Sequence, residues 1–169
     1  TLPYYFDADE TSYLKHFELI ADNSPLPVVL YNIPPMTHSK ITVEIVSAVA
    51  QHDNIIGIKD SSGDMEGFHA MLKLHETNPD FKVMQGAERN IAESLLSGAD
   101  AIVPGLGNVT PQLFVQIIAS ARAGDTETVL ALQEQINALW ELHGYAHWLI
   151  CLKYAASLAG IAGRAAICR

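Results

Sequence analysis

The sequence predicts an α/β protein in which helices cover a mostly parallel sheet. Four short apolar segments bounded by Gly, Pro or Asn indicate buried strands, and apolar residues at helical spacing lie between them. Strands and helices that alternate with short loops are typical of a parallel sheet with helices on its outer faces. A doubly wound sheet and a (β/α)8 barrel both fit this pattern, because periodicity does not distinguish them.

The strands are recognised by apolar runs that stop at turn-forming residues. Pro34-Pro35 follows the first run, Asp60 follows the second, Gly86 closes the third, and Pro104-Gly105 follows the fourth. The starts of the runs form a coarse repeat that suits successive βα units. Strands are predicted over residues 28–32, 54–59, 81–86 and 99–103.

The helices are predicted from apolar stripes and from residues suited to their N-termini. Thr42, Asp64 and Thr110 precede such stripes as candidate caps, and Pro111 suits the first helical position. After the fourth strand the chain becomes wholly helical, which indicates an appendix that serves mostly for packing. Helices are predicted over residues 10–22, around Ile45 and Val49, from Asp64 to Asn78, around Ile91 and Leu95, and over 111–124, 126–144 and 145–160.

The composition argues against several classes of partner. A net charge of −9 disfavours nucleic acids and anionic membranes, which bind basic patches. No apolar stretch is long enough to span a bilayer, so neither a nucleic acid nor a membrane is predicted as a partner. Cys151 and Cys168 are too few and too far apart for a disulfide framework or a zinc knuckle, which favours a reducing cytoplasm.

Motifs for metals and for dinucleotides are missing from the sequence. None of the seven histidines belongs to a metal-ligand motif. His143 and His147 are four residues apart but span Gly144, and we interpret them as surface or partly buried helix residues. Gly105-Leu106-Gly107 lacks the third glycine of a dinucleotide fingerprint. Neither a metal nor an organic cofactor is therefore predicted.

A lysine at the end of a buried strand is the main chemical signal. The segment Asn54–Asp60 delivers Lys59 at its tip. An unpaired buried charge is costly, so such a lysine either finds a partner or has a lowered pKa. An amine of lowered pKa attacks carbonyls and forms a Schiff base. Taken alone, the segment favours a Lys59 that lies just past the strand and points into water.

The other strand ends change that balance. Tyr31, Gly86 and Val103 end the remaining strands, and the ends of parallel strands converge on one face where sites are built. A phenol beside a lysine can move a proton to and from a carbonyl oxygen while the lysine holds the substrate as an imine. A glycine at a strand end lets a ligand approach the backbone closely. Tyr31 and Lys59, one βα unit apart, together predict an active site.

Several segments carry a family resemblance that covers nearly the whole chain. They are Tyr4-Tyr5, Leu30-Tyr31-Asn32-Ile33-Pro34, Gly57-Ile58-Lys59-Asp60 followed by Ser62-Gly63-Asp64, Gly86, and Gly98-Ala99-Asp100-Ala101-Ile102-Val103. In this order they resemble the dihydrodipicolinate synthase / N-acetylneuraminate lyase family. Its members are (β/α)8 barrels, usually tetramers, with a C-terminal helical extension. They use a lysine Schiff base with pyruvate or a related 2-oxo acid.

The resemblance implies a role for each matched residue. Lys59 would form the imine and Tyr31 would be the proton shuttle. Tyr5 resembles the tyrosine that completes a hydroxyl relay across a subunit contact. The carbonyl of Gly86 and the side chain of Val103 would line the pyruvyl pocket.

The chain resembles only part of that family. The family's first strands, which carry the paired small hydroxyl residues that bind the pyruvyl carboxylate, come before Tyr4, and the chain opens on Thr1 rather than on methionine. After Arg169 the family continues into more helix. We therefore expect residues 1–124 to be the C-terminal half of a barrel, with about strands five to eight, and 125–169 to be an incomplete extension. Because the sheet would have open edges and only half a core, we expect that this segment by itself does not fold into an active enzyme.

One position departs from the synthases within the family. By the resemblance, the synthases have the pattern P-x-R-T here, and its arginine holds the carboxylate of the aldehyde substrate. This chain has Met36 in place of that arginine, and a thioether donates no hydrogen bond. The resemblance to lyases and to 2-keto-3-deoxy sugar acid aldolases fits better. Glu88 would then accept a bond from a substrate hydroxyl and Arg89 would meet a distal carboxylate. The alternative is that both belong to the exposed first turn of a helix.

With the resemblance, the strand-end lysine and tyrosine predict a class I aldolase or lyase that works without a cofactor. The resemblance further implies a small 2-oxo acid as substrate and a homo-oligomer, dimer or tetramer. One alternative is the synthase itself, which condenses pyruvate with aspartate semialdehyde. The other is a family member that binds a ligand without catalysis.

Overall fold

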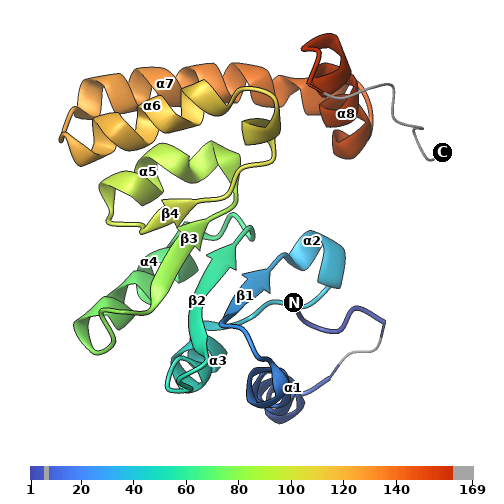
Figure 1. The fold of residues 1–169 in the computed structure, drawn as a ribbon, viewed down its shortest axis with the longest axis vertical. Coiled ribbons are helices and arrows are strands. Elements are labelled where there is room, and N and C mark those ends of the chain that lie inside the picture. The colour runs from blue at the N-terminus through green and yellow to red at the C-terminus, as the bar shows by residue number, and fades with distance from the viewer. Residues whose placement is uncertain (6–7, 162–169) are drawn as a thin grey trace.

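The fold is built on one four-stranded parallel sheet (Figure 1). A computed structural model describes residues 1–5 and 8–161. The strands lie side by side in chain order, and every neighbouring pair is parallel, as the sequence predicts. Residues 162–169, where the sequence predicts the end of the C-terminal extension, lie outside the described residues. The strands are β1 (Val28–Asn32), β2 (Ile55–Asp60), β3 (Lys82–Gln85) and β4 (Ala101–Ile102).

Helices connect the strands and continue beyond the last one. Each of the three strand-to-strand connections contains at least one α-helix, which is the arrangement expected of successive βα units. The α-helices are α1 (Glu10–Asn23), α2 (Pro34–Thr37), α3 (Val43–Val49), α4 (Met65–Leu72), α5 (Ile91–Leu96), α6 (Pro111–Arg122), α7 (Thr126–Trp140) and α8 (Trp148–Leu158). Short 3₁₀ helices are η1 (Lys73–Glu76), η2 (Glu88–Asn90), η3 (Leu106–Asn108) and η4 (Glu141–Gly144).

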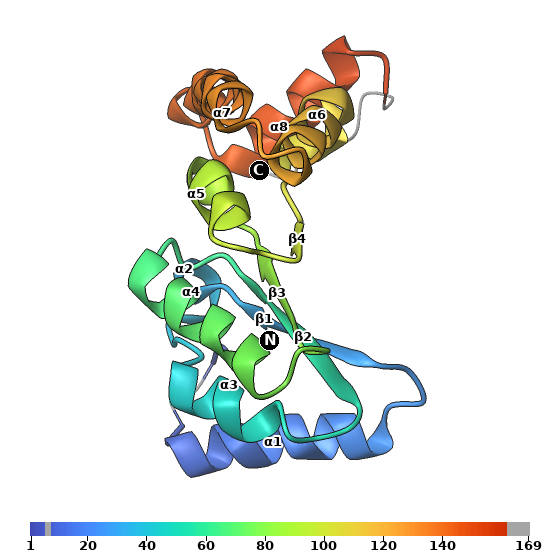
Figure 2. The same ribbon diagram turned by 90° about the vertical axis from the view of Figure 1, so that its left-hand side faces the viewer.

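Two apolar clusters hold these layers together. Helices α1, α3 and α4 cover one side of the first three strands (Figure 2), and buried residues such as Phe17, Phe68 and Ile58 fill the space between them. A second cluster joins α5, α6 and α7, with Ile117 and Ile136 fully buried. Figure 1 shows α6 and α7 side by side, with α8 beyond the far end of α7.

The observed caps explain most helix starts. Thr42 and Asp64 accept hydrogen bonds from the third residue after each, as predicted. Thr110 does not cap α6, contrary to the prediction, because its hydroxyl donates to the carbonyl of Leu106 (3.4 Å). Proline at the start of α6 needs no such acceptor, since it has no N–H group.

The C-terminal helices are shorter than the sequence predicts. Helix α7 gives way to the 3₁₀ turn η4 after Trp140, and α8 begins only at Trp148. His147 precedes α8 and its Nδ1 accepts from the N–H of Leu149 (3.4 Å), which fixes the start of the helix. None of the described helices has the length and apolar character needed to cross a bilayer.

Candidate active site

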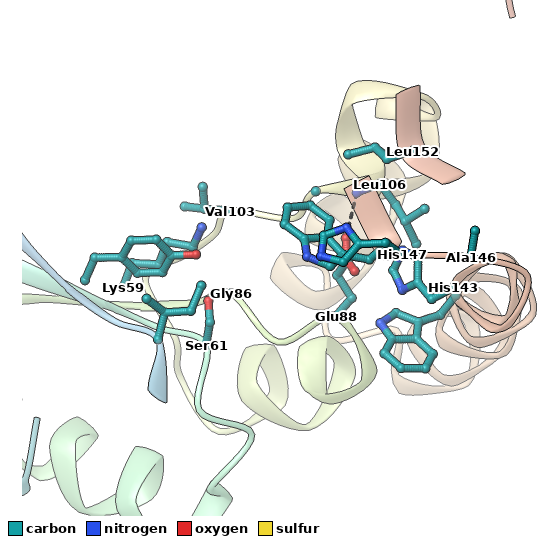
Figure 3. Close-up of a pocket in the computed structure, with 15 residues that line it drawn as sticks. Lys59, Ser61, Gly86, Glu88, Val103, Leu106, His143, Ala146, His147 and Leu152 are labelled. Carbon is teal, nitrogen blue, oxygen red and sulfur yellow. Dashed lines mark hydrogen bonds between the residues drawn. The ribbon is translucent and has the colours of Figure 1, made fainter. Parts of the chain in front are cut away.

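A pocket opens at the carboxyl ends of the strands, where parallel α/β proteins place their sites (Figure 3). Its volume is about 520 Å³, which suits a small metabolite. One part of the lining comes from the strand ends and the other from the turns around α7 and α8. The lining residues are Tyr31, Ile33, Lys59, Ser61, Gly86, Glu88, Val103, Gly105, Leu106, Trp140, His143, Ala146, His147, Trp148 and Leu152.

Tyr31 and Lys59 meet in this pocket. They are paired residues on β1 and β2, so their side chains lie on the same face of the sheet. Lys59 Nζ is 4.2 Å from the centroid of the Tyr31 ring, which is a cation–π distance. Lys59 is half-buried. The structure therefore places the predicted amine beside the predicted phenol, and not alone in bulk solvent.

A buried polar network fixes the two strand ends behind these side chains. Asn32 and Asp60, each 1% exposed, are the next paired residues of β1 and β2. Asn32 Nδ2 donates to Asp60 Oδ1 (2.6 Å), and the hydroxyl of Ser62 donates to Asp60 Oδ2 (2.8 Å). The other amide atom, Asn32 Oδ1, accepts from the N–H of Ile41 (2.9 Å). Burial raises the pKa of the Asp60 carboxyl above its usual range, and the hydrogen bonds from Ser62 and Asn32 offset part of that rise.

Gly86 is required at its position by the closeness of its neighbours. Its N–H donates to the carbonyl of Asp60 (2.7 Å) just after β3. A Cβ added there would clash with the hydroxyl of Ser61 and would lie 2.7 Å from Lys59 Cε. The absent side chain thus makes room for the lysine and keeps the backbone open to the pocket.

Glu88 lies in the pocket as a buried carboxylate, 8% exposed. Its Oε1 accepts from the N–H of Leu106 (2.6 Å), which Figure 3 marks. Gln133 on α7 donates to the backbone carbonyl of Glu88 (3.0 Å) and so holds η2 against α7. Burial raises the pKa of the Glu88 carboxyl, and Leu106, His143 and Lys59 offset part of this rise.

Two predicted site residues lie elsewhere. The guanidinium of Arg89 is 4.3 Å from the Trp140 ring centroid and donates to Glu141 (3.0 Å), and Arg89 is absent from the pocket lining. This corrects the expectation that Arg89 faces the substrate: in the 3₁₀ turn η2, successive side chains point about a third of a turn apart, so Glu88 points inward and Arg89 outward. Tyr5 is 80% exposed and also lies outside the lining, while Val103 lines the pocket and is 43% exposed.

The sequence interpretation missed the wall that the C-terminal turns contribute. Trp140, His143, His147 and Trp148 line the pocket, whereas the sequence predicts the histidines to be surface or partly buried helix residues and the appendix to serve mostly for packing. The signal available in the sequence is that a tryptophan lies near a histidine twice: Trp140 is three residues before His143, and His147 is next to Trp148. Among the described residues, no group of three or more His, Cys, Asp or Glu side chains is placed to hold a metal ion.

Comparison with known proteins identifies the family. The model of the dihydrodipicolinate synthetase family matches residues 1–169. The chain belongs to this family. The 4-hydroxy-tetrahydrodipicolinate synthase of Methanospirillum hungatei is 31% identical over 95% of this chain and 54% of its own length. YagE of Escherichia coli K12, named provisionally as a 2-dehydro-3-deoxy-D-gluconate aldolase, is 34% identical over 83% of this chain and 48% of its own length.

Solved structures of the family share the fold. YagE in complex with pyruvate has a TM-score of 0.85 at 27% identity, covering 96% of this chain and 55% of that one. Dihydrodipicolinate synthase from Bacteroides thetaiotaomicron has a TM-score of 0.86 at 33% identity, covering 94% and 55%. The chain thus spans about half the length of its relatives, and its four βα units are part of a (β/α)8 barrel with a C-terminal helical extension.

Proposed function

We propose that this chain contributes the catalytic half of a class I aldolase or lyase that acts on a 2-oxo acid through a Schiff base at Lys59. The observation that carries the proposal is the position of Lys59 Nζ, in a pocket at the strand ends and 4.2 Å from the Tyr31 ring. The face of that ring stabilises a cation. It would therefore stabilise the protonated imine, whose positive charge is on the same nitrogen.

The proposed reaction balances without a cofactor. Lys59 attacks the ketone of the 2-oxo acid and water leaves, which gives the protonated imine. The C3–C4 bond breaks and its electron pair moves to C3, forming an enamine, while the C4 hydroxyl loses its proton and becomes an aldehyde. Tyr31 relays that proton, which ends on C3. Water then hydrolyses the imine, releasing pyruvate and the free amine. The reverse sequence makes the C–C bond.

The aldehyde half is proposed to be that of a 2-keto-3-deoxy sugar acid or of an N-acetylneuraminate-type substrate. Among the described residues, Lys59 is the sole Lys or Arg in the pocket lining, so no arginine or second lysine from this part of the chain meets a distal carboxylate. Met36, which takes the place of the arginine in the P-x-R-T pattern of the synthases, is 50% exposed and does not line the pocket. Glu88, in contrast, offers a carboxylate to a hydroxyl.

The synthase reaction is the second candidate, since several curated relatives are named 4-hydroxy-tetrahydrodipicolinate synthases at 30–32% identity. A ligand-binding protein without catalysis is the third. Steady-state assays with pyruvate plus aspartate semialdehyde, with 2-keto-3-deoxygluconate and with N-acetylneuraminate separate the first two.

A lysine substitution distinguishes catalysis from binding alone. Lys59→Arg keeps a cation but removes the imine-forming amine, so turnover should fall about a thousandfold or more. The matched control is Lys82→Arg on the neighbouring strand, whose amine pairs with Asp100 (3.4 Å) away from the pocket and should leave turnover unchanged. Full activity in Lys59→Arg would exclude the proposed chemistry.

The proposal includes assembly and location. We propose a homo-oligomer, dimer or tetramer, in which the exposed Tyr5 completes the hydroxyl relay of a neighbouring subunit, and we propose that the enzyme works in the cytoplasm. Residues 1–124 would form the barrel half and 125–169 the extension. Sedimentation of the intact protein, with Tyr5→Phe compared with wild type for turnover, tests the assembly.

A further inference from the structure

The first three strands of the sheet end in a row of buried polar side chains. Asn32, Asp60 and Gln85 are paired residues of β1, β2 and β3, so they share one face of the sheet, and each is 1% exposed. The row two residues earlier on this face is buried and apolar; it consists of Leu30, Ile58 and Val83. Tyr31 and Lys59 come one residue before the polar row and point to the opposite face, into the pocket. The polar row therefore lies behind the active-site pair, across the sheet.

The side chains of Asn32 and Asp60 hold the loops that follow their own strands. Asn32 Oδ1 accepts from the N–H of Ile41 (2.9 Å), in the loop beyond β1. Asp60 Oδ2 accepts from the hydroxyl of Ser62 (2.8 Å), in the loop beyond β2. The bond from Asn32 Nδ2 to Asp60 Oδ1 (2.6 Å) joins the two strands at this level. Both loops are thereby tied to the ends of the strands that carry the active-site pair.

Gln85 holds the turn after β3 in the same way. Its Oε1 accepts from the N–H of Ala87 (2.7 Å), which closes the turn around Gly86. Its Nε2 donates to the hydroxyl of Ser94 (2.7 Å), a fully buried residue of α5. The side chain thus fixes the turn after β3 to the helix that follows it.

The main chain of the same row holds part of the pocket lining. Each carbonyl of the row accepts from the N–H of a lining residue that belongs to the next strand or to the segment just after it. The pairs are Asn32 with Ser61 (2.8 Å), Asp60 with Gly86 (2.7 Å) and Gln85 with Val103 (2.9 Å). Figure 3 shows these three lining residues gathered around Lys59.

Stability alone does not call for polar side chains in this row. A buried polar group costs free energy unless it is hydrogen-bonded, and replacing both partners of such a bond by apolar groups of the same shape is often nearly neutral. Hydrogen bonds add direction, because they restrict both distance and angle. A misplacement of about 1 Å can cost about a hundredfold in rate, so direction matters where the strands give way to the loops of a site.

We propose that Asn32, Asp60 and Gln85 are positioning residues for imine formation, and that the row fixes the strand ends and the pocket backbone so that the Lys59 amine meets the ketone in one geometry. This proposal rests on the proposed function, because the step it serves is the attack of Lys59. It gives the row a part in the rate of the reaction in addition to the stability of the sheet.

The test measures how fast the folded protein captures pyruvate. The intact protein is mixed with excess pyruvate and quenched with borohydride at intervals, and mass spectrometry follows the adduct. The rate constant reports the geometry of folded molecules, and the final amount of adduct reports the fraction that is folded. Asp60→Ala should lower the rate constant about tenfold. Asp60→Asn should keep it within about threefold of wild type, because the amide still accepts from Asn32 and can donate to Ser62.

Two further variants separate positioning from stability. Gln85→Met keeps the volume of the side chain but loses the bond to Ala87, and should also lower the rate constant about tenfold; it keeps the test open if Asp60→Ala does not fold. The matched control is Asn54→Ala at the amino end of β2. Asn54 Nδ2 donates to three backbone carbonyls far from the pocket, those of Ala21 (2.9 Å), Ser24 (3.0 Å) and Leu26 (3.2 Å). Its loss should lower stability and leave the rate constant unchanged.

The outcomes distinguish this proposal from the proposed function. Rate constants equal to wild type in Gln85→Met and in folded Asp60→Ala would overturn the positioning role alone, as would a loss in Asp60→Asn as large as that in Asp60→Ala. An equal fall in Asn54→Ala would also overturn it, since any destabilised variant would then react slowly. Absence of an adduct on Lys59 in the wild type would overturn the proposed function and the positioning role with it.

Discussion

The Asn32–Asp60 network behind the active-site lysine gives a prediction that the geometry makes quantitative. Asp60→Ala removes the acceptor of two short hydrogen bonds and leaves Asn32 Nδ2, which is fully enclosed, without a partner. A buried donor left unsatisfied costs about 1–3 kcal/mol, and a hydrogen bond to a charged group contributes about 1.5–3 kcal/mol. Relief of the burial cost of the carboxylate offsets part of this, so we expect the free energy of unfolding to fall by about 2–4 kcal/mol.

Asp60→Asn is the matched control. Its amide oxygen can still accept from Asn32 and its NH₂ group can donate to the hydroxyl of Ser62, so the variant should stay within about 1 kcal/mol of wild type near pH 4. Urea unfolding of the intact protein, followed by fluorescence and circular dichroism with coincident transitions, measures both variants. An alanine variant as stable as wild type, or equal in stability to the asparagine variant, would refute the role assigned to the network.

The pH dependence has a definite sign. Because burial raises the native pKa of Asp60, the unfolded chain releases this proton at a lower pH than the folded chain does. The contribution of Asp60 to stability is therefore present below the ordinary Asp pKa of about 4 and falls as the pH rises through the raised native pKa. As the pH rises between these two pKa values, the free energy of unfolding of Asp60→Asn should increase relative to that of wild type. Above the raised native pKa the difference between the two proteins should stay constant. A difference that does not change with pH would contradict the raised pKa.

Three further predictions concern other parts of the chain. Gly86→Ala should lower the rate of imine formation at least tenfold, because its Cβ would displace the Lys59 side chain; pyruvate trapping kinetics measure this, and an unchanged rate contradicts it. Arg89→Ala should lower the free energy of unfolding by about 1 kcal/mol, because the contact with Trp140 is lost, and should leave KM unchanged. A raised KM in steady-state assays would show that Arg89 contacts the substrate. Residues 1–169 expressed by themselves should show no turnover, because β1 and β4 are open edges of the described sheet and Val29 on β1 is 40% exposed; a soluble, active monomer contradicts this.

Local patterning was enough to predict the strands and the pairing at their ends. Apolar runs and turn residues place β1 and β2, and parallel order then brings Tyr31 beside Lys59 without further information. The choice between a barrel and a doubly wound sheet required the family resemblance, because the number of strands and their closure are tertiary properties. The fold comparisons confirm the barrel.

The C-terminal wall of the pocket could not be predicted from local pattern. His143 and His147 follow a long helix, and their approach to the strand ends depends on how α7 packs on η2 through Gln133. The side chain of Arg89 could not be placed from the sequence either. Its neighbour Glu88 points into the pocket, while the tight turn η2 directs Arg89 toward Trp140. Adjacent residues thus have different surroundings for a reason that only the backbone geometry supplies.

The central claim is that one amine at the end of a barrel strand captures a keto acid covalently. The most direct measurement incubates the intact protein with pyruvate and borohydride and maps the product by mass spectrometry after proteolysis. We predict a single stable adduct on the peptide that carries Lys59, and none in Lys59→Arg. An unmodified Lys59 in the wild type, or an adduct found only on other lysines, would contradict the account.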